Sequence, residues 1–360
     1  MEKILIYFNS MHPAGGIERV IATLSDKLSV KYDITILVKD EPNSFYRLNE
    51  SVKIVTLNNE LKFNMHNRVS RIFAAFKNVV RNSGKLKAYL RSNQYDFYYL
   101  AHPLSVLEFS LAGSDMRKVL ITEHGAKSAY NQVYNLIKKV LYKRCRTYIV
   151  PTKTDTELYI KDGMPAICIP HFRSNLPYSL ASKTNKRVLN VGRFTPDKQQ
   201  EILLKIWSNI IYKRGCKDWT LDIVGSGELE KELRELVAKY KLEEFVKFNA
   251  TTKLIETYYE SASIFALTSV SEGFGMVLLE AISFGIPCVS FDCPSGPRDI
   301  IENNVNGYLV PLNDSGKFEN KLFELIQSKN LITEMGNNAY ARSNDWSDEV
   351  ILEKWFKILS

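Results

Sequence analysis

The sequence has 360 residues, of which 45% are hydrophobic and 24% charged, as in a soluble globular protein with two medium-sized domains. The apolar run at residues 4–8 is too short for the core of a signal peptide, and no stretch reaches the roughly 18 apolar residues that span a bilayer. The five cysteines form no C-x-x-C pair, which indicates reduced cytoplasmic thiols and argues against a disulfide-stabilised secreted protein.

The net charge of +8 is unevenly distributed along the chain. Residues 1–175 contain 26 Lys and Arg against 15 Asp and Glu, a balance of +11, so the remainder carries −3. The basic first half therefore favours an anionic partner, such as a membrane surface or a phosphorylated acceptor. Nucleic acid is not expected, because no recognised nucleic-acid-binding motif accompanies the basic residues.

The first half alternates short apolar runs with segments of mostly helical periodicity. Strands are predicted at residues 3–8, 33–38, 52–57, 97–101, 119–122, 148–151 and 166–170. Alternation of this kind predicts a parallel, doubly wound α/β sheet.

Two loops of the first half carry candidate site residues. Gly15 and Gly16 precede a predicted helix, where backbone N–H groups can approach a phosphate, although a tight strand-to-helix turn would need the same residues. His124 follows the strand at residues 119–122 and so lies at its carboxyl end, where open α/β folds bind ligands. A single histidine at such a place is also compatible with a purely structural role.

The stretch from residue 61 to 95 contains eight basic residues and no acidic one. Val69, Ile72, Phe73, Phe76 and Val79 or Val80 recur at helical spacing within it. A basic amphipathic helix is typical of proteins that bind membrane surfaces. The alternative is a helix that packs on the sheet and exposes a solvated basic face.

The polar, proline-containing residues 176–186 are predicted to link two domains. The second domain is predicted to contain strands at residues 187–191, 221–224, 246–249, 264–267, 287–291 and 307–310. After the first of them, Asp197 is predicted to cap a helix that ends near residue 212. Arg193 and Lys198 then flank a helix N-terminus, which is unfavourable for the helix dipole unless an anion lies between them. A diphosphate would fit there, and a solvated basic turn is the alternative.

Glu272 and Glu280 lie on either side of a strand-to-helix transition. Residues 264–267 are predicted to form a buried strand, and from Gly275 the chain reads as a helix that is apolar nearly all round. Glu280 lies within that helix, and a buried carboxylate needs a partner because its desolvation is costly. That partner is either a buried arginine or a bound ligand, such as the vicinal hydroxyls of a ribose.

Together these motifs resemble those of glycosyltransferase family 4, whose members have the GT-B fold and use nucleotide sugars. The two glutamates match its Glu-x7-Glu signature, and Gly15 and Gly16 match its Gly-Gly-x-Glu loop. The family's element of a Gly-Arg pair followed by a Lys, which is implied to bind the nucleotide diphosphate, corresponds to Gly192, Arg193 and Lys198. The resemblance covers almost the whole chain and is weakest between residues 40 and 95.

The resemblance assigns roles to these residues. It places Glu280 on the ribose, Glu272 on the hydroxyls of the transferred sugar and His124 near the reacting centre. The donor site is further implied to include the backbone of Gly273, Phe274 and Gly275. His124, Arg193, Lys198 and Glu272 are implied to be catalytic, and the remaining motif residues to bind the donor.

The expected architecture is two Rossmann-like domains with a cleft between them. Residues 1–175 would form the acceptor-side domain and residues 187–344 the nucleotide-sugar-binding domain, with a last helix at residues 345–360 packing back on the first domain. The expected reaction moves a hexose or N-acetylhexosamine, with retention of configuration, from a UDP-sugar to a glycan acceptor, which is expected to be lipid-linked. The sequence contains no Asp-x-Asp motif, so neither a metal nor another cofactor is expected.

Other functions of the same fold remain open at this point. A sugar-nucleotide epimerase would need no acceptor, a phosphorylase would need inorganic phosphate, and a non-catalytic subunit would only bind the nucleotide sugar. The resemblance favours transfer in the synthesis of a surface polysaccharide such as capsule, exopolysaccharide or O-antigen. It also favours a cytoplasmic location, with peripheral attachment to the inner face of the plasma membrane.

Overall fold

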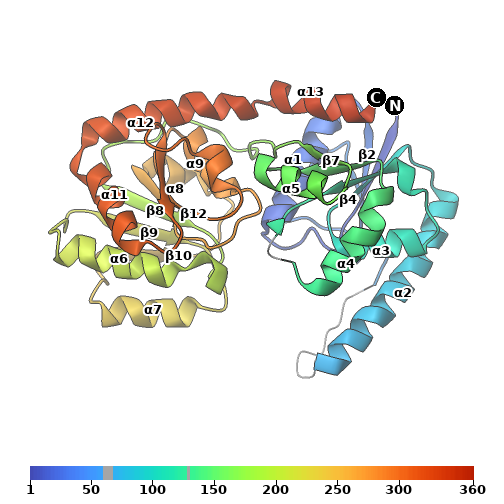
Figure 1. The fold of residues 1–360 in the computed structure, drawn as a ribbon, viewed down its shortest axis with the longest axis horizontal. Coiled ribbons are helices and arrows are strands. Elements are labelled where there is room, and N and C mark those ends of the chain that lie inside the picture. Colours follow the sequence, from blue (N-terminus) through green and yellow to red (C-terminus); the bar gives the residue numbers. More distant parts are fainter. Residues whose placement is uncertain (60–67, 128–129) are drawn as a thin grey trace. The chain divides into compact units, whose positions relative to one another are not determined.

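A computed structural model describes residues 1–59, 68–127 and 130–360, and gives only the backbone of residues 68–76. It divides the chain into two compact units. Unit 1 comprises Met1–Phe172 and Asp348–Ser360, and unit 2 comprises Arg173–Ser347 (Figure 1). No helix within the described ranges is long and apolar enough to cross a membrane.

Unit 1 is built on a seven-stranded parallel sheet with the order β3-β2-β1-β4-β5-β6-β7. Its strands are β1 (Lys3–Tyr7), β2 (Asp33–Val38), β3 (Lys53–Thr56), β4 (Phe97–Leu100), β5 (Val119–Thr122), β6 (Thr147–Val150) and β7 (Ala166–Cys168). Most strand residues are buried, as in a parallel sheet that is covered by helices on both faces. The helices are α1 (Gly16–Leu28), α2 (Arg68–Ser92), α3 (Pro103–Leu111), α4 (Gln132–Leu141), α5 (Lys153–Lys161) and α13 (Asp348–Leu359), with short 3₁₀ turns η1 (Met116–Lys118) and η3 (Tyr142–Arg144).

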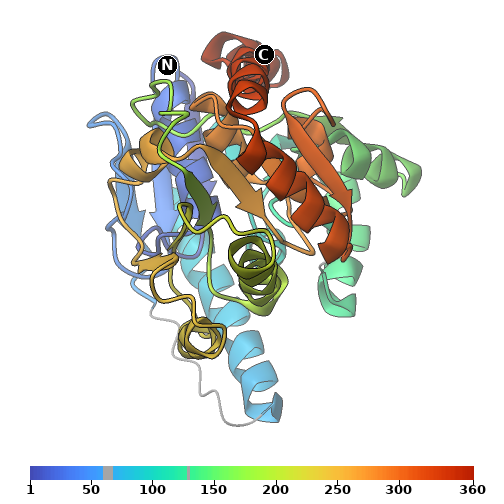
Figure 2. The same cartoon turned by 90° about the vertical axis from the view of Figure 1, so that its left-hand side faces the viewer.

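Unit 2 has a six-stranded parallel sheet with the order β10-β9-β8-β11-β12-β13. Figure 2 views the ribbon from the side on which Figure 1 draws this unit. Its strands are β8 (Arg187–Val191), β9 (Thr220–Val224), β10 (Val246–Asn249), β11 (Ile264–Leu267), β12 (Cys288–Asp292) and β13 (Gly307–Pro311). Its helices are α6 (Gln200–Tyr212), α7 (Glu230–Lys239), α8 (Glu256–Ser261), α9 (Met276–Ser283), α10 (Pro297–Ile300), α11 (Ser315–Gln327) and α12 (Lys329–Arg342), with 3₁₀ turns η4 (Pro196–Lys198) and η5 (Ser343–Trp346). Trp207 of α6 is fully buried in the core of this unit.

In both sheets the strand order reverses at one place, between β1 and β4 in unit 1 and between β8 and β11 in unit 2. Strands on either side of such a reversal send their connections to opposite faces of the sheet. A crevice therefore forms at their carboxyl ends, and this is where doubly wound folds bind ligands.

Apart from shifts of up to two residues at strand ends, the structure differs from the predicted boundaries at three places. The first domain ends at Phe172 instead of residue 175, and residues 173–175 belong to unit 2 together with the predicted linker. Residues 176–186 do not stand apart as a linker but belong to unit 2, where the amides of Ala181 and Ser182 donate to the carbonyls of Phe284 and Glu260 at 2.8 Å. The last helix begins at Asp348 instead of residue 345, and it belongs to unit 1.

The third difference concerns the helix after β8, which begins at Gln200 and is not capped by Asp197. Gln199 has φ +49° and a left-handed conformation, so it ends the 3₁₀ turn Pro196–Lys198 and separates it from the α-helix. Lys198 consequently lies in that turn and not in the first turn of α6.

Candidate active site

The strand reversal in unit 2 brings together the loops that follow β8 and β11, at residues 192–199 and 268–275. The amide of Val270 donates to the carbonyl of Asp197 at 2.9 Å. The Thr268 hydroxyl donates to the carbonyl of Lys198 at 3.0 Å and lies 3.1 Å from that of Gln199. These bonds hold the two loops beside each other at the carboxyl edge of the sheet.

Lys198 and Glu272 form an ion pair across these loops. Their Nζ and Oε1 atoms lie 2.8 Å apart, and the side chains are 17% and 11% exposed. Burial by itself lowers the pKa of Lys198, but Glu272 and then Asp197 outweigh it, so the pKa lies above its ordinary value. A positive charge is thus fixed at the sheet edge at neutral pH. Arg193 lies on the same loop with an exposed side chain, and its carbonyl accepts from Gln200 Nε2 at 2.9 Å.

The loop after β9 packs against the loop after β8. The Phe194 amide donates to the carbonyl of Ser226 at 2.9 Å, and the Phe194 carbonyl accepts from the amide of Leu229 at 3.1 Å. A Cβ atom added at Gly227 would lie 2.4 Å from the Phe194 carbonyl oxygen, which leaves no room for one. The loop that carries Arg193 and Lys198 is therefore fixed by close backbone packing.

Glu280 lies inside α9 and is 1% exposed. Its Oε1 accepts from the Ser174 hydroxyl at 2.6 Å, and its Oε2 accepts from the Tyr259 hydroxyl at 2.7 Å. Gly275 precedes the helix with φ +91°, a conformation that favours glycine, and so lets the chain turn from the Glu272 loop into α9. The structure places Glu272 at the entrance of the helix and Glu280 in its interior, as the sequence predicted.

The loop between the two glutamates also packs closely on a neighbouring turn. Phe274 is buried, and its carbonyl oxygen lies 2.6 Å from where a Cβ atom at Gly296 would stand. Gly273 and Gly275 flank Phe274, so the backbone of this loop is held against the turn that follows β12.

In unit 1, His124 follows β5 at the carboxyl edge of the sheet. Its Nε2 lies 2.9 Å from the Thr122 hydroxyl and 3.4 Å from the Tyr99 hydroxyl. Its ring stacks on His171, with centroids 5.3 Å apart and planes at 12°. Loss of hydration, followed by the charges of His102 and Lys138, lowers the pKa of His124 to about 3. The imidazole is therefore neutral at neutral pH.

Gly15 and Gly16 lie in the connection that follows β1, which borders the strand reversal of unit 1. Helix α1 begins at Gly16, and Gly15 caps it in an extended conformation. A Cβ atom at Gly15 would lie 2.0 Å from Glu18 Oε2, whereas one at Gly16 would meet nothing within 4 Å. The predicted site residues thus divide between the units, with both glycines and His124 in unit 1 and the others in unit 2.

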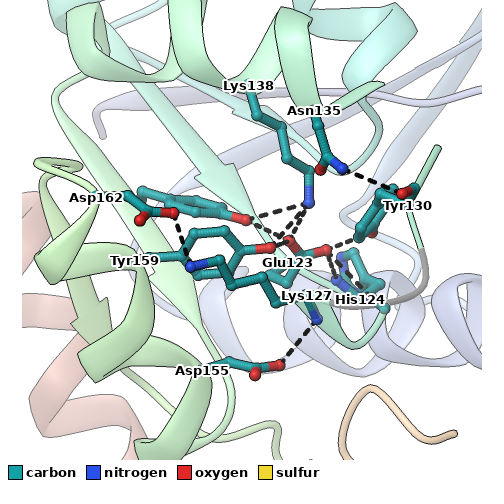
Figure 3. Close-up of polar contacts among 11 residues, drawn as sticks. Glu123, His124, Lys127, Tyr130, Asn135, Lys138, Asp155, Tyr159 and Asp162 are labelled. Atoms are coloured by element: carbon teal, nitrogen blue, oxygen red, sulfur yellow. Dashed lines mark hydrogen bonds and ion pairs between the residues drawn. The ribbon is translucent and has the colours of Figure 1, made fainter. Parts of the chain in front are cut away.

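Sequence reasoning missed the most heavily hydrogen-bonded carboxylate of this region, Glu123. It is 2% exposed and pairs with Lys138, which is also buried (Figure 3). The hydroxyls of Tyr130, Tyr148 and Tyr159 all donate to it, the last at 2.8 Å.

Glu123 also binds the loop that carries His124. Its Oε1 accepts from the amides of His124 and Gly125, at 2.9 and 3.2 Å. Burial tends to raise the pKa of Glu123, but Lys138 and the tyrosine hydroxyls together hold it below the ordinary value. The ionised carboxylate therefore fixes the backbone at the predicted catalytic histidine.

No group of three or more His, Cys, Asp or Glu side chains in the described part of the chain could hold a metal ion. The predicted independence from metal remains a prediction.

Comparison with protein families matches both units. Residues 14–172 match the family model described as Glycosyltransferase Family 4, and residues 173–342 match the model described as Glycosyl transferases group 1. The two matches meet at the boundary between the two compact units.

Similar curated proteins extend over nearly the same length. The amylovoran biosynthesis glycosyltransferase AmsD of Erwinia amylovora is 29% identical over all of both chains, and an uncharacterised glycosyltransferase of Haemophilus influenzae is 28% identical over all of both chains. A Campylobacter jejuni α-1,4-N-acetyl-D-galactosaminyltransferase, whose name specifies a glycan on PP-undecaprenol, is 24% identical over 96% of this chain and 95% of its own.

Two solved structures show the fold. Staphylococcus aureus TarM, as a G117R mutant in complex with fondaparinux, α-GlcNAc-glycerol and UDP, superposes with a TM-score of 0.81 at 15% identity and full coverage of both chains. Sucrose-phosphate synthase of Thermosynechococcus elongatus gives a TM-score of 0.83 at 18% identity, over 99% of this chain and 98% of that one. The predicted GT-B fold is confirmed.

Proposed function

Because the chain belongs to the family 4 type of glycosyltransferases, we propose that it transfers a hexose or N-acetylhexosamine from a nucleoside diphosphate, UDP in particular, to a glycan hydroxyl. The proposed acceptor is lipid-linked, and the proposed pathway is the synthesis of a bacterial surface polysaccharide. AmsD, named for amylovoran biosynthesis, and the Campylobacter enzyme, named for a glycan on PP-undecaprenol, support both assignments.

The observation that carries the proposal is the Lys198–Glu272 pair at the strand reversal of unit 2. When a nucleoside diphosphate leaves the sugar, negative charge develops on its phosphate oxygens. Lys198 is held in place by Glu272 before substrate binds, so it can stabilise that charge without first being reorganised. Arg193 on the same loop supplies a planar, bidentate donor for the same diphosphate.

Glu280 is proposed to hold the ribose. Its two oxygens accept from the hydroxyls of Ser174 and Tyr259, and a ribose hydroxyl can take the place of a hydroxyl donor of this kind. Because the side chain is 1% exposed, the ribose would reach it by displacing the Ser174 hydroxyl. Glu272 would accept from hydroxyls of the transferred sugar, and the backbone of Gly273, Phe274 and Gly275 would face the donor.

His124 is proposed to act near the reacting carbon as a neutral hydrogen-bonding group. Because its pKa is lowered, His124 carries no proton to donate as an imidazolium at neutral pH. It would therefore orient a sugar hydroxyl and not act as a general acid. Gly15 and Gly16 would bring the N-terminus of α1 near the donor phosphates. Retention of configuration, through front-face attack assisted by the leaving phosphate, is proposed from family membership.

Calorimetry with UDP and GDP tests these assignments. Glu280→Gln removes charge-assisted hydrogen bonds worth about 1.5–3 kcal/mol and should weaken the binding of the preferred nucleotide accordingly. Lys198→Ala and Arg193→Ala should weaken binding and also slow turnover, whereas Lys217→Ala, at an exposed lysine outside the two loops, should do neither. Unchanged affinity for both nucleotides in folded Glu280→Gln would instead assign Glu280 a structural role.

Metal dependence and reaction type are tested on the same protein. We expect hydrolysis or transfer of a labelled donor to continue in EDTA, because Lys198 and Arg193 supply the positive charge. Activity that disappears in EDTA and returns with Mg²⁺ or Mn²⁺ would contradict this. A product that forms only with a glycan acceptor would separate transfer from epimerisation, and one that requires inorganic phosphate would indicate a phosphorylase.

A peripheral position at an anionic, cytoplasmic membrane face is proposed for the enzyme, since a lipid-linked acceptor would lie there. In the part of α2 with described side chains, Val79 and Leu86 are buried while Lys77, Arg81 and Lys87 are exposed. This half of the helix packs on unit 1 and presents a basic face, so it can contribute electrostatic attraction. Phe73 and Phe76, two apolar residues of the predicted basic amphipathic helix, lie outside the described side chains.

A further inference from the structure

Helix α4 exposes aliphatic side chains and buries a lysine. Val133, Leu136 and Val140 are 64%, 62% and 50% exposed, whereas Lys138 is 2% exposed. An amphipathic helix on a globular domain usually turns its apolar side chains toward the core. The three aliphatic residues are spaced by three and four positions, so they form one outward stripe.

The rotation of α4 is fixed from within unit 1. Lys138 pairs with Glu123 at the end of β5, and its Nζ lies 3.1 Å from the Tyr159 hydroxyl of α5 (Figure 3). Turning the helix to bury its aliphatic stripe would leave Glu123 in the interior without its cation. The exposed stripe is therefore part of the folded state and not a frayed edge.

The surroundings of the stripe are basic. Residues 125–154 contain no Asp or Glu and seven basic residues, which are Lys127, Lys138, Lys139, Lys143, Arg144, Arg146 and Lys153. Lys139, Lys143 and Arg144 are exposed, and they follow Leu136 and Val140 by three or four positions. The surface thus combines an apolar centre with a cationic margin.

This combination identifies the kind of partner. A symmetric dimer would place the stripe of one copy against that of another, and the three cations of each would then lie close to those of its partner. An anionic lipid surface offers an apolar interior under negative headgroups and so complements both properties at once.

We propose that the outward face of α4 is the membrane-insertion surface of the enzyme, with Val133, Leu136 and Val140 entering the interface and Lys139, Lys143 and Arg144 binding anionic headgroups. This inference rests on the proposed peripheral location and adds to it the element that inserts. In the described half of α2, Val79 and Leu86 are buried and Val80 is 52% exposed, so this half exposes a single large aliphatic side chain among its cations and no aliphatic stripe.

Vesicle co-sedimentation tests the proposal with the full chain and phosphatidylglycerol–phosphatidylcholine vesicles. Leu136→Asn/Val140→Asn should lower partitioning about tenfold or more, because interfacial binding scales with buried apolar area. Lys139→Gln/Lys143→Gln/Arg144→Gln should lower it on the order of a hundredfold at low salt and much less at high salt. All variants should retain UDP affinity and the parent circular dichroism spectrum.

Matched controls lie in unit 2. Leu254→Asn/Val305→Asn removes two exposed aliphatic residues, 62% and 39% exposed, and Lys213→Gln/Lys217→Gln/Lys239→Gln removes three exposed cations. Both controls should sediment with vesicles like the parent. A loss as large as that of the α4 variants would overturn the assignment of α4.

The remaining outcomes separate this inference from the proposed function. Parent-like sedimentation of both α4 variants, with loss in Arg81→Gln/Lys87→Gln/Arg91→Gln, would overturn insertion by α4 and keep the peripheral location. Equal partitioning to neutral and anionic vesicles, or none at low salt, would overturn both.

A dimer of the parent that dissociates in Leu136→Asn/Val140→Asn, seen by light scattering, would assign the surface to self-association. Donor turnover in the same samples reports on the glycosyltransferase assignment independently.

Discussion

At the scale of single residues, two buried glutamates are held in different ways. Glu123 accepts from a lysine, three tyrosine hydroxyls and two backbone amides, so the protein itself occupies its oxygens. The partners of Glu280 include the hydroxyls of Ser174 and Tyr259, and a substrate hydroxyl can replace a hydroxyl donor of this kind at little cost. The first arrangement suits a residue that positions others, and the second suits a residue that binds a ligand.

Glu123→Gln should therefore destabilise unit 1 strongly. The substitution leaves the buried Lys138 ammonium without its carboxylate, and removing one partner of a buried pair costs about 3–5 kcal/mol. Urea unfolding would measure this loss, and Glu123→Gln/Lys138→Met should recover part of it by removing the unpaired charge. Lys127→Met, which breaks the more exposed Lys127–Asp162 pair, should cost no more than about 1 kcal/mol. Equal losses in Glu123→Gln and Lys127→Met would show that the buried pair has no special role.

The lowered pKa of His124 predicts that the folded protein loses stability as the pH becomes acidic. Its pKa is about 3 in the folded protein against an ordinary value of 6.5, so the unfolded chain binds a proton that the folded chain refuses. Stability from this group is present above pH 6.5 and is lost as the pH falls from 6.5 toward 3. Between pH 6.5 and 5 the parent should lose unfolding free energy because of this group. We expect His124→Asn to remove about 1 kcal/mol of that loss, allowing for partial exposure of the ring. His12→Asn, at an exposed histidine, is the control, and identical pH profiles for parent and His124→Asn would contradict the assignment.

The sequence indicated Glu272, Glu280, Arg193 and Lys198 because each lies in a short motif next to a buried strand. The structure brings Lys198 and Glu272 into contact, although they are 74 residues apart. Glu123 was not predicted because its side-chain partners come from the loop at Tyr130, α4, β6 and α5, at separations of 7 to 36 residues. The one local signal for a functional role of Glu123 was its position directly after a buried strand. That signal was assigned to the neighbouring His124.

At the scale of elements, the strands were the most predictable feature and the helix boundaries the least. A strand buried on both faces appears as a short continuous apolar run, and those runs give the bounds of β1, β8 and β11 to within a residue. The start of α6 depends on one left-handed residue, Gln199, which is not a residue type that signals that conformation. The segment 176–186 looked like a linker because it is polar, but its backbone hydrogen bonds tie it to unit 2.

Gly227 provides a test of how the β9 loop supports the donor site. A Cβ atom there would lie 2.4 Å from the Phe194 carbonyl oxygen and 2.6 Å from its amide nitrogen, so Gly227→Ala must displace the loop that carries Arg193 and Lys198. We expect a loss of about 1–3 kcal/mol in unfolding free energy and weaker UDP binding by calorimetry.

The matched control is Gly84→Ala, at an exposed position of α2 where a Cβ atom meets nothing within 4 Å. Removing a glycine from a helix interior should stabilise the protein by about 0.5–1 kcal/mol and leave UDP binding unchanged. Parent-like UDP affinity in Gly227→Ala would show that the β9 loop does not position the donor site.

At the scale of the whole molecule, each unit repeats the same doubly wound plan, and the chain returns to the first unit at its end. The second sheet has the strand order of the first without the seventh strand. The resemblance to family 4 predicted that the last helix packs on the first domain. The structure places α13 in unit 1 and shows the contacts that hold it there. Trp355 lies 6.2 Å from Tyr99 between ring centroids, and Lys27 pairs with Asp348 at 2.6 Å.

The last helix should consequently stabilise unit 1 selectively. Trp355 is 5% exposed and packs on the core side of unit 1, so Trp355→Ala should cost about 3–5 kcal/mol through lost burial and a cavity. Hydrogen exchange would localise the effect: amides of β1 and β4 should exchange faster in the variant, and amides of β8 and β11 should not. Val350→Ala, in the same helix but 39% exposed, should change unfolding by no more than about 0.5 kcal/mol. Faster exchange of equal size in both sheets would mean that the two units unfold as one, and α13 could then no longer be treated as part of unit 1 alone.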